Sequence, residues 1–452
     1  MSLPDFSKAN ILVVGDVILD RYMIGSVNRT SPEAPVPVML FNKERHTLGG
    51  AANVAHNAAM LGVKTQLFGL IGNDQSGRTI ETRCNERGID ALLQTVGFPT
   101  ITKTRVVANN QQIVRIDHEE PIVLTNEEET EFIRLIKKQA VGVDAIIFSD
   151  YGKGTLSDGI IRKVKAYCSE SNIPLFIDPK GLNWEKYRGT FLLSPNLKEL
   201  AEAYGQSLPN TDAAVAEAAQ VILERLNLKN LLVTRSSRGM TLVNDSGIQH
   251  FSAKAREIFD VSGAGDTVIA TMASAFASTG DLNQAVEVAN IAAGIVIGKS
   301  GTATVTNAEL KQANDISSTK SMTNDVTVFT NGCFDVLHAG HVKLLQEART
   351  HGSRLLVGLN SDASVSRLKG PQRPVNPIED RKSVLMALSC VDDVIVFDED
   401  TPERLLSELK PDILVKGSDY AEHEVIGREH AGKVVLIDLL AGRSTTSILN
   451  KG

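Results

Sequence analysis

The stretch DVSGAGD, at Asp260–Asp266, runs directly into the apolar segment TVIATMASAFA. Its small residues Gly263, Ala264 and Gly265 predict a tight turn at the start of a helix, where backbone N–H groups and the helix N-terminus can hold an anion. Such a pocket would stabilise the charge that builds on a migrating phosphoryl group, and Asp266 could take the proton from an attacking hydroxyl. The alternative is a glycine-rich helix entry with an aspartate in its first turn and no chemistry.

A second segment rich in small residues is LGGAANVAHNAAMLG, at Leu48–Gly62. Gly49 and Gly50 precede a predicted helix that can pack tightly beneath a polyol, and Asn53 near its start can hydrogen-bond sugar hydroxyls. A tightly packed core helix would explain the alanines equally well. It explains the two glycines and Asn53 less well.

A third segment, SPNLKEL at Ser194–Leu200, follows an apolar strand. Asn196 and Glu199 are three residues apart, so at a helix start they face the same side. An amide oxygen and a carboxylate in this position suit Mg²⁺ held through water near phosphates. Taken alone, the pattern is better explained as an ordinary helix N-terminus.

The composition restricts the classes of function that these segments can serve. The chain has 452 residues, of which 42% are hydrophobic and 22% charged, a balance typical of globular proteins. At roughly 100–200 residues per domain, two or three domains are expected. The net charge of −7 argues against a dedicated nucleic-acid binder, but it leaves room for a local basic site that holds a small phosphate.

The expected location is the cytoplasm. The N-terminal residues MSLPDFSKAN lack the layout of a signal peptide. Apolar stretches such as Val268–Ala277 are too short to cross a membrane. The scattered cysteines indicate reduced thiols rather than a disulfide framework.

Short β-branched runs alternate with longer amphipathic segments, such as Glu127–Gln139 and Asp212–Leu226, which predicts α/β structure with largely parallel sheets. Strands are expected at Ile11–Gly15, Ala145–Ser149, Leu175–Asp178, Leu231–Thr234, Val326–Thr330, Arg354–Leu359, Asp393–Phe397, Ile413–Lys416 and Lys433–Ile437.

Two segments interrupt this alternation. Arg21–Phe41 contains three prolines and predicts extended or edge structure, a small β flap. Residues 313–325, within the polar stretch KQANDISSTKSMTND, are interpreted as a linker. The chain would then divide into a first domain of residues 1–312 and a second, Rossmann-like domain of residues 326–452.

The three segments described first, in this order and spacing, resemble the ribokinase-type sugar kinase family over roughly residues 8–310. The resemblance implies a ribokinase-like domain, ATP as co-substrate with Mg²⁺, and Asp266 as the catalytic base. It implies substrate binding by Asp16, Gly49, Gly50 and Asn53. It implies ATP binding by Asn196, Lys198, Glu199, Thr234, Gly239, Gly263, Ala264, Gly265 and Asn290, with Mg²⁺ near Asn196 and Glu199. One departure is Val261-Ser262, where the family often has threonine after the first aspartate.

The second predicted domain contains FTNGCFDVLHAGHVKLL, at Phe329–Leu345. A strand runs into a glycine turn, and His338 and His341 open a helix with both imidazoles on one side. This arrangement suits nucleotidyl transfer, in which the attacking phosphate oxygen is already ionised and the site must hold a nucleotide α-phosphate and its leaving group. The alternative is a zinc site, which the glycines and the lack of a clear fourth ligand disfavour.

Two further segments of the second domain can face phosphates. GRSTTSI, at Gly442–Ile448, offers hydroxyls and an arginine at a helix start, although a capping segment is the better account of it alone. RLKGPQRP, at Arg367–Pro374, is a basic loop that is either merely solvated or closes on phosphates.

Residues 325–450 resemble the cytidylyltransferase-like nucleotidyltransferases, which carry an HxGH motif and a late Ser-Thr-Thr motif. The resemblance implies catalysis by His338 and His341. It implies nucleotide binding by Thr330, Asn331, Gly332, Asp335, Gly340, Lys369, Arg373, Arg443, Ser444, Thr445 and Thr446.

The pair of domains resembles the bacterial bifunctional heptose kinase and adenylyltransferase family of ADP-heptose synthesis, which supplies the lipopolysaccharide core. The resemblance implies phosphorylation of a heptose 7-phosphate at its anomeric hydroxyl, removal of the 7-phosphate by a separate phosphatase, and adenylyl transfer to heptose 1-phosphate. The residues alone leave other sugar phosphates open, as well as a kinase with a nucleotide-sensing second domain. A homodimer formed through the flap is expected, with a lid over its own site as the alternative.

Overall fold

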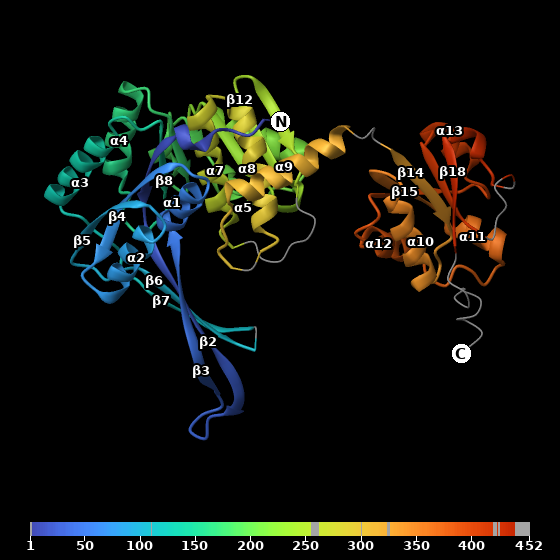
Figure 1. Cartoon of the computed structure of the whole chain (residues 1–452), viewed down its shortest axis with the longest axis horizontal. Coiled ribbons are helices and arrows are strands. Elements are labelled where there is room, and N and C mark those ends of the chain that lie inside the picture. The colour runs from blue at the N-terminus through green and yellow to red at the C-terminus, as the bar shows by residue number, and fades with distance from the viewer. Residues whose placement is uncertain are drawn as a thin grey trace. The chain divides into compact units, whose positions relative to one another are not determined.

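The computed structural model describes residues 2–109, 111–254, 262–299, 301–322, 326–418, 423 and 425–438. The chain divides into a first unit, Met1–Asn314, and a second unit, Asp315–Gly452 (Figure 1). Both units are α/β, as predicted.

The first unit is built on a nine-stranded sheet in the order β13-β12-β11-β10-β9-β8-β1-β4-β5. The strands from β11 to β5 in this order are parallel, and β12 and β13 are antiparallel additions. Their bounds are β1 Asn10–Gly15, β4 Lys64–Gly72, β5 Asp90–Val96, β8 Ala145–Ser149, β9 Leu175–Asp178, β10 Leu192–Leu193, β11 Asn230–Thr234, β12 Met240–Asn244 and β13 Gly247–Phe251.

Helices cover both faces of this sheet. Within β1, Ile11 and Val13 join one core cluster, and Leu12 and Val14 join the other. This burial on both faces explains why the strand is continuously apolar instead of alternating. The first cluster includes helices α1 (Ala51–Met60), α2 (Gln75–Asn85), α7 (Ala264–Thr279) and α8 (Leu282–Val296). The second includes α3 (Asn126–Gln139), α4 (Asp158–Glu170), α5 (Leu197–Tyr204) and α6 (Asp212–Arg225).

The predicted flap is a four-stranded sheet in the order β3-β2-β6-β7, which extends away from the main sheet in Figure 1. Its strands are β2 Val17–Thr30, β3 Pro37–Gly50, β6 Thr102–Ala108 and β7 Gln111–His118. Pro32 and Pro35 lie in the turn between β2 and β3, and Pro37 begins an edge strand, where a missing N–H is tolerated. The flap is larger than Arg21–Phe41 because β6 and β7, far along the chain, pair with it.

The second unit is a five-stranded parallel sheet in the order β16-β15-β14-β17-β18, the doubly wound arrangement that was predicted. Its strands are β14 Thr327–Gly332, β15 Arg354–Asn360, β16 Asp393–Phe397, β17 Ile413–Gly417 and β18 Lys433–Ile437. Its helices are α10 Ala339–Thr350, α11 Asp362–Lys369, α12 Ile378–Met386 and α13 Glu403–Leu409.

Helix α9 (Asn307–Met322) runs through most of the segment interpreted as a linker. The boundary between the two units falls inside this helix, at Asn314 and Asp315. Within the described residues, none of the helices has the length and apolar character that crossing a bilayer requires.

Candidate active sites of the two units

The first unit gathers polar side chains at the carboxyl ends of its parallel strands. Asp150 and Tyr151 follow β8, Asp178 ends β9, Asn196 follows β10, and Thr234 ends β11. In parallel α/β sheets this edge is where ligands bind.

Asp266, the predicted base, lies in the first turn of α7 and is 5% exposed. Its two carboxylate oxygens accept one hydrogen bond each. Asn53 Nδ2 on α1 donates to Oδ2 at 2.7 Å, and the Tyr151 hydroxyl donates to Oδ1 at 2.8 Å. The site therefore joins α1, α7 and the loop after β8 at one carboxylate.

Burial raises the pKa of Asp266 to about 6. The hydrogen bonds from Asn53 and Tyr151 lower it in part, and the negative charge of Asp20 raises it. The carboxyl is thus ionised at neutral pH, with a pKa close to the range that suits a general base.

Asp16, predicted to bind substrate, is fully buried. Its carboxylate instead holds the loop after β8 through hydrogen bonds to the backbone. Its Oδ2 accepts backbone N–H bonds from Tyr151 at 2.8 Å and Lys153 at 3.0 Å, and its Oδ1 accepts one from Thr155 at 3.1 Å. The carboxylate whose charge acts on Asp266 is instead Asp20 on β2, which is 5% exposed and pairs with Arg105 on β6.

The two predicted substrate glycines have packing reasons to be glycine. A Cβ on Gly49 would lie 2.5 Å from Asp20 Oδ2, and one on Gly50 would lie 2.3 Å from the Asp16 carbonyl oxygen. Gly50 also has a φ of 56°, which L side chains rarely adopt. These glycines let β2, β3 and the start of α1 approach closely around the aspartates.

Two cavities adjoin Asp266. The larger, of about 560 Å³, is lined by most of the residues predicted to bind ATP. The smaller, of about 170 Å³, is lined by Asp266 and the acidic side chains near it. Asn196, Thr234 and Gly265 line both, so the two cavities meet at these residues. The predicted ATP residues lining the larger cavity are Asn196, Lys198, Thr234, Gly239, Ala264, Gly265 and Asn290, and those lining the smaller are Asn196, Glu199, Thr234, Gly263 and Gly265.

The glycines near these cavities differ in what surrounds them. A Cβ on Gly265 would have no heavy atom within 4 Å, so this position leaves open space for a ligand. Gly263 caps α7 in the left-handed conformation with a φ of 78°. A Cβ on Gly239 would lie 1.9 Å from the carbonyl oxygen of Phe251, so this glycine is required for packing beside β13.

Asn196 and Glu199 form a reciprocal capping box at the start of α5. The Asn196 N–H donates to Glu199 Oε2 at 3.0 Å, and the Glu199 N–H donates to Asn196 Oδ1 at 2.9 Å. Lys180 Nζ donates to the other carboxylate oxygen of Glu199 at 2.7 Å. Asn196 and Glu199 therefore cap the start of α5, which is the ordinary role that the sequence also allowed. Both residues also line the smaller cavity.

Several residues of this site were missed by the sequence analysis. They are Asp20, Lys103, Asp150, Tyr151, Asp178 and Lys180. For Tyr151 and Asp178 a signal was present, because each lies at or just after the carboxyl end of a predicted strand. Burial and the neighbouring charges of Asp266 and Glu199 raise the pKa of Asp178 well above its usual range.

In the second unit, His338 and His341 lie on one side of the start of α10, as predicted. Their rings stack with centroids 3.8 Å apart, and His338 Nδ1 accepts the Gly340 N–H at 3.2 Å. Burial, with a contribution from His338, lowers the pKa of His341 to about 4, so this imidazole is neutral at pH 7. Its Nδ1 is buried without a protein partner. In the described part of the chain, no third ligand side chain joins the pair to form a metal site.

Asp335, predicted to bind nucleotide, organises the basic loop. It accepts backbone N–H bonds from Val375 at 2.7 Å and Asn376 at 3.0 Å, and it pairs with Arg373. The side chain of Asn376 donates to the Asp335 carbonyl oxygen. Residues 373–376 are therefore fastened to the turn after β14.

Asn331, at the end of β14, accepts a hydrogen bond from Lys416 Nζ on β17 at 2.6 Å. Thr330 Oγ1, on the same strand, is buried without a hydrogen-bond partner. Lys369 ends α11, and its charge lowers the pKa of Cys333, although burial raises that pKa overall. These predicted residues surround the turn that carries Gly332. Arg443, Ser444, Thr445 and Thr446 lie outside the described residues, as do Asp260 and Val261.

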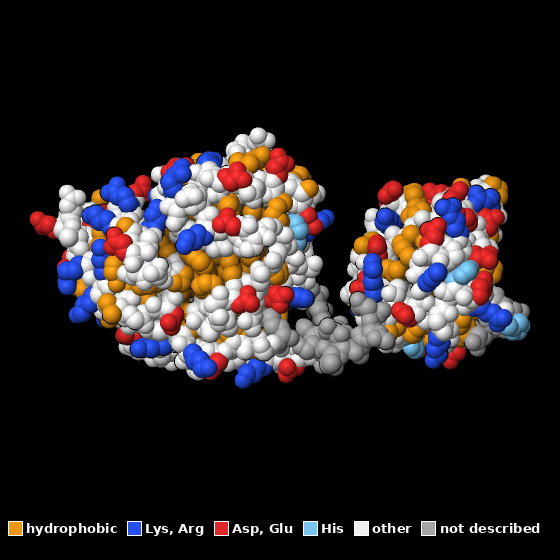
Figure 2. Space-filling model, turned by 90° about the horizontal axis from the view of Figure 1, so that it is seen from above, with side chains coloured by type: hydrophobic (Ala, Val, Ile, Leu, Met, Phe, Trp, Pro, Cys, Tyr) orange, Lys and Arg blue, Asp and Glu red, His pale blue; other side chains and the backbone are white. Residues whose placement is uncertain are grey.

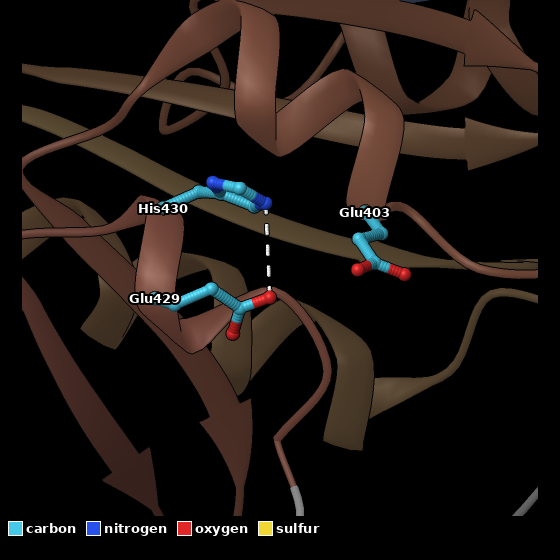
Figure 3. A group of neighbouring side chains, drawn as sticks. All are labelled: Glu403, Glu429 and His430. Carbon is cyan, nitrogen blue, oxygen red and sulfur yellow. Dashed lines mark ion pairs between the residues drawn. The ribbon is translucent and has the colours of Figure 1, made fainter.

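Figure 3 shows Glu403, Glu429 and His430, whose ligand atoms lie within 4.8 Å of one another. Both glutamates are exposed, and His430 pairs with Glu429 at 3.7 Å. Glu403 lies in the first turn of α13, where a negative charge stabilises the helix. Ordinary surface electrostatics account for this group.

On the face seen in Figure 2, Lys and Arg side chains are interspersed with Asp and Glu, with no broad patch of one sign.

The comparisons with known proteins agree with the two predicted domain families. A family described as pfkB family carbohydrate kinase matches residues 8–309, and one described as cytidylyltransferase-like matches residues 329–436. Among solved structures, phosphofructokinase-2 from Escherichia coli covers 69% of this chain at 16% identity with a TM-score of 0.59. Ribokinase from Thermotoga maritima covers 68% at 23% identity with a TM-score of 0.53. These two likenesses show the fold of the first unit.

Relatives that match both units are named bifunctional protein HldE. The protein from Methylobacillus flagellatus is 45% identical over 98% of this chain and 96% of its own length. Those from Gluconacetobacter diazotrophicus and Hahella chejuensis are 44% identical, cover 99% and 100% of this chain, and are themselves covered to 98%. The resemblance stated from the sequence is thereby confirmed. The chain belongs to the HldE family of bifunctional proteins and is an enzyme that joins a kinase to a nucleotidyltransferase.

Proposed function

We propose that the first unit transfers the γ-phosphate of ATP to the anomeric hydroxyl of D-glycero-β-D-manno-heptose 7-phosphate, with Asp266 as the base. The observation that carries this proposal is the position of Asp266, which lines the smaller cavity and directly follows Gly265, a residue that lines both cavities. A nucleotide in the larger cavity would direct its terminal phosphate towards Asn196, Thr234 and Gly265.

In this proposal the acceptor hydroxyl gives its proton to Asp266 as its oxygen attacks the γ-phosphorus, and ADP leaves. The turn at Gly263–Gly265 would hold the charge on the migrating group through backbone N–H groups. Asn53, which contacts Asp266, and Asp20 would hold the sugar hydroxyls. Asp16, Gly49 and Gly50 would contribute by shaping the site and by holding the loop that carries Tyr151.

The donor set of the smaller cavity fits Mg²⁺. Asp150, Asp178, Glu199 and Asp266 line it, and Lys180 is the cationic side chain among the described residues that do so. An acidic pocket would repel a triphosphate unless a divalent cation accompanied it. Glu199 and Asn196 would hold the ion through water, with Asp178 nearby, and the ion would neutralise phosphate charge.

We infer that the second unit transfers AMP from ATP to heptose 1-phosphate and releases pyrophosphate. His338 and His341 would contact the phosphates at the start of α10. The unpartnered Nδ1 of His341 and Oγ1 of Thr330 support a ligand there, since buried polar atoms without partners are costly. Lys369 and Arg373, with Arg443, Ser444, Thr445 and Thr446, would hold the rest of the nucleotide. Both reactions consume ATP, so the cytoplasm is the location that this proposal requires.

A panel of sugar phosphates tests the substrates. ATP consumption by the whole chain is measured with heptose 7-phosphate and with other sugar phosphates, and pyrophosphate release is measured with heptose 1-phosphate. Turnover of the two heptose phosphates supports the proposal. Turnover of another sugar without turnover of heptose 7-phosphate contradicts it. His338→Ala should abolish pyrophosphate release while sparing the kinase, and unchanged release would remove His338 from the reaction.

We propose also that the flap mediates homodimer formation. Exposed apolar side chains on β3 and β7 include Leu40 and Phe41, each more than half exposed, and Ile116 at 54%. Leu40 and Phe41 lie on β3 and Ile116 on β7, the two edge strands of the flap, where a second copy of the chain could cover exposed apolar side chains. Mass measurement by light scattering should give a dimer, and Phe41→Ser with Ile116→Ser should give a monomer. A monomeric unsubstituted chain would favour the lid instead.

A further inference from the structure

Tyr151 lies at the centre of the contacts that fix the orientation of Asp266. Its hydroxyl donates to Asp266 Oδ1 at 2.8 Å, whereas Oδ2 receives its hydrogen bond from Asn53 at 2.7 Å. The two donors come from different elements, the loop after β8 and helix α1. A carboxylate held at both oxygens cannot rotate about its last bond without losing one of these hydrogen bonds.

The loop that carries Tyr151 is held in place by the buried carboxylate of Asp16. The Tyr151 N–H donates to Asp16 Oδ2 at 2.8 Å, and Lys153 and Thr155 donate to the same carboxylate. Asp16 is fully buried, so its three charge-assisted hydrogen bonds are shielded from water. Lys103 Nζ lies 5.6 Å from the centre of the Tyr151 ring, which favours one position of the ring.

The hydroxyl of Tyr151 is a permanent proton donor. Burial and the negative charges of Asp266 and Asp178 raise the pKa of Tyr151 well above its usual range. The group therefore stays protonated at every pH at which the enzyme works. It favours the ionised form of Asp266, because only the carboxylate oxygen accepts its hydrogen bond with full strength.

We propose that Tyr151 is a positioning residue of the kinase reaction, whose hydroxyl holds Asp266 Oδ1 so that Oδ2 accepts the proton of the sugar hydroxyl. This inference rests on the proposed role of Asp266 as the base. In the step concerned, the O–H bond of the acceptor breaks, its proton passes to Oδ2, its oxygen bonds to the γ-phosphorus, and the bond from that phosphorus to the oxygen of ADP breaks. Tyr151 keeps its own proton throughout.

The test is the pH profile of kcat/KM for phosphorylation by the full chain carrying Tyr151→Phe. Loss of one hydrogen bond to the carboxylate should raise the pKa of Asp266. The acid limb of the profile should therefore move to higher pH, by about one unit. Activity on that limb should fall by on the order of tenfold and recover at higher pH. The change should appear in kcat, and KM for ATP should stay within about twofold of the unsubstituted chain, because Tyr151 does not line the nucleotide cavity.

The matched control is Tyr167→Phe on α4, whose hydroxyl makes a 3.4 Å hydrogen bond to the Lys137 carbonyl oxygen. It should leave the acid limb in place. Tyr151→Leu, which also lacks the hydroxyl, is measured alongside, so that a folding defect in one variant does not decide the outcome. An unshifted acid limb in either folded Tyr151 variant overturns the inference. An inactive unsubstituted chain, or an active Asp266→Asn variant, would contradict the proposed function itself.

Discussion

Asn53 and Asp266 are separated by 213 positions in the chain, and the amide of the first donates to the carboxylate of the second at 2.7 Å. The contact joins α1 to α7, whose small residues let the two helices approach each other. A second bond runs beside it, from the Thr267 hydroxyl to Asn57 Oδ1 at 2.9 Å. The glycine-rich segment and the alanine-rich helix therefore meet at the predicted base.

Removing the amide of Asn53 should weaken both the site and the fold. Asn53→Ala leaves Asp266 Oδ2 buried without its donor, which costs about 1.5–3 kcal/mol for a hydrogen bond to a charged group. Chemical denaturation should show this loss in the transition of the first unit. Asn57→Ala, which removes the neighbouring pair, is the control and should keep kinase activity closer to normal. Equal kinase losses in the two variants would contradict a specific role for Asn53.

The raised pKa of Asp266 predicts how stability depends on pH. A carboxyl whose folded pKa is about 6, against 3.8 in the unfolded chain, favours folding below pH 4 and loses that contribution as pH rises through 6. Asp266→Asn removes the buried charge, so it should stabilise the first unit at pH 7–8 by up to roughly 2–3 kcal/mol and hardly at pH 4. Thermal unfolding at the two pH values measures this. If Asp266→Asn stabilised the first unit less at pH 8 than at pH 4, the buried charge of Asp266 would not have the predicted effect.

Two glycines of the nucleotide cavity should respond differently to alanine. Gly265→Ala adds a methyl group into open space, so the melting temperature should hardly change while KM for ATP rises on the order of tenfold. Gly239→Ala places its Cβ 1.9 Å from a backbone oxygen at a φ of 80°, so the first unit should be strongly destabilised. Calorimetry and ATP titration of both variants separate the effects. A destabilised Gly265→Ala with normal KM would contradict the assignment of the cavity.

In the second unit, Asp335 should act through the loop that it holds. Asp335→Ala releases Val375, Asn376 and Arg373 together, so adenylyl transfer should fall by about 10- to 100-fold with the kinase unchanged. Arg404→Ala, which removes only exposed ion pairs, is the control and should leave both activities within about twofold. Pyrophosphate release with heptose 1-phosphate measures the first effect. Normal release in Asp335→Ala would show that the loop is not needed.

The strands and the two-unit organisation could be predicted from the sequence, because buried parallel strands form continuous β-branched runs. Asp266 could be proposed from its glycine-rich context alone. The roles of Asp16 and Asp20 could not. Asp16 follows the first strand directly, but its partners lie 135 to 139 positions later in the loop after β8. Asp20 lies opposite Lys103 only because β2 pairs with β6. This pairing joins distant parts of the chain, so no local sequence pattern predicts it.

We propose that one chain carries two separate active sites and that Asp266 is essential to one of them only. The most direct test is to assay Asp266→Asn for both activities in one preparation, with Asp245→Asn in the exposed turn between β12 and β13 as the control. We predict that phosphorylation of heptose 7-phosphate is abolished while pyrophosphate release from ATP and heptose 1-phosphate stays at the unsubstituted rate. Equal loss of both activities in a folded Asp266→Asn protein would contradict the account.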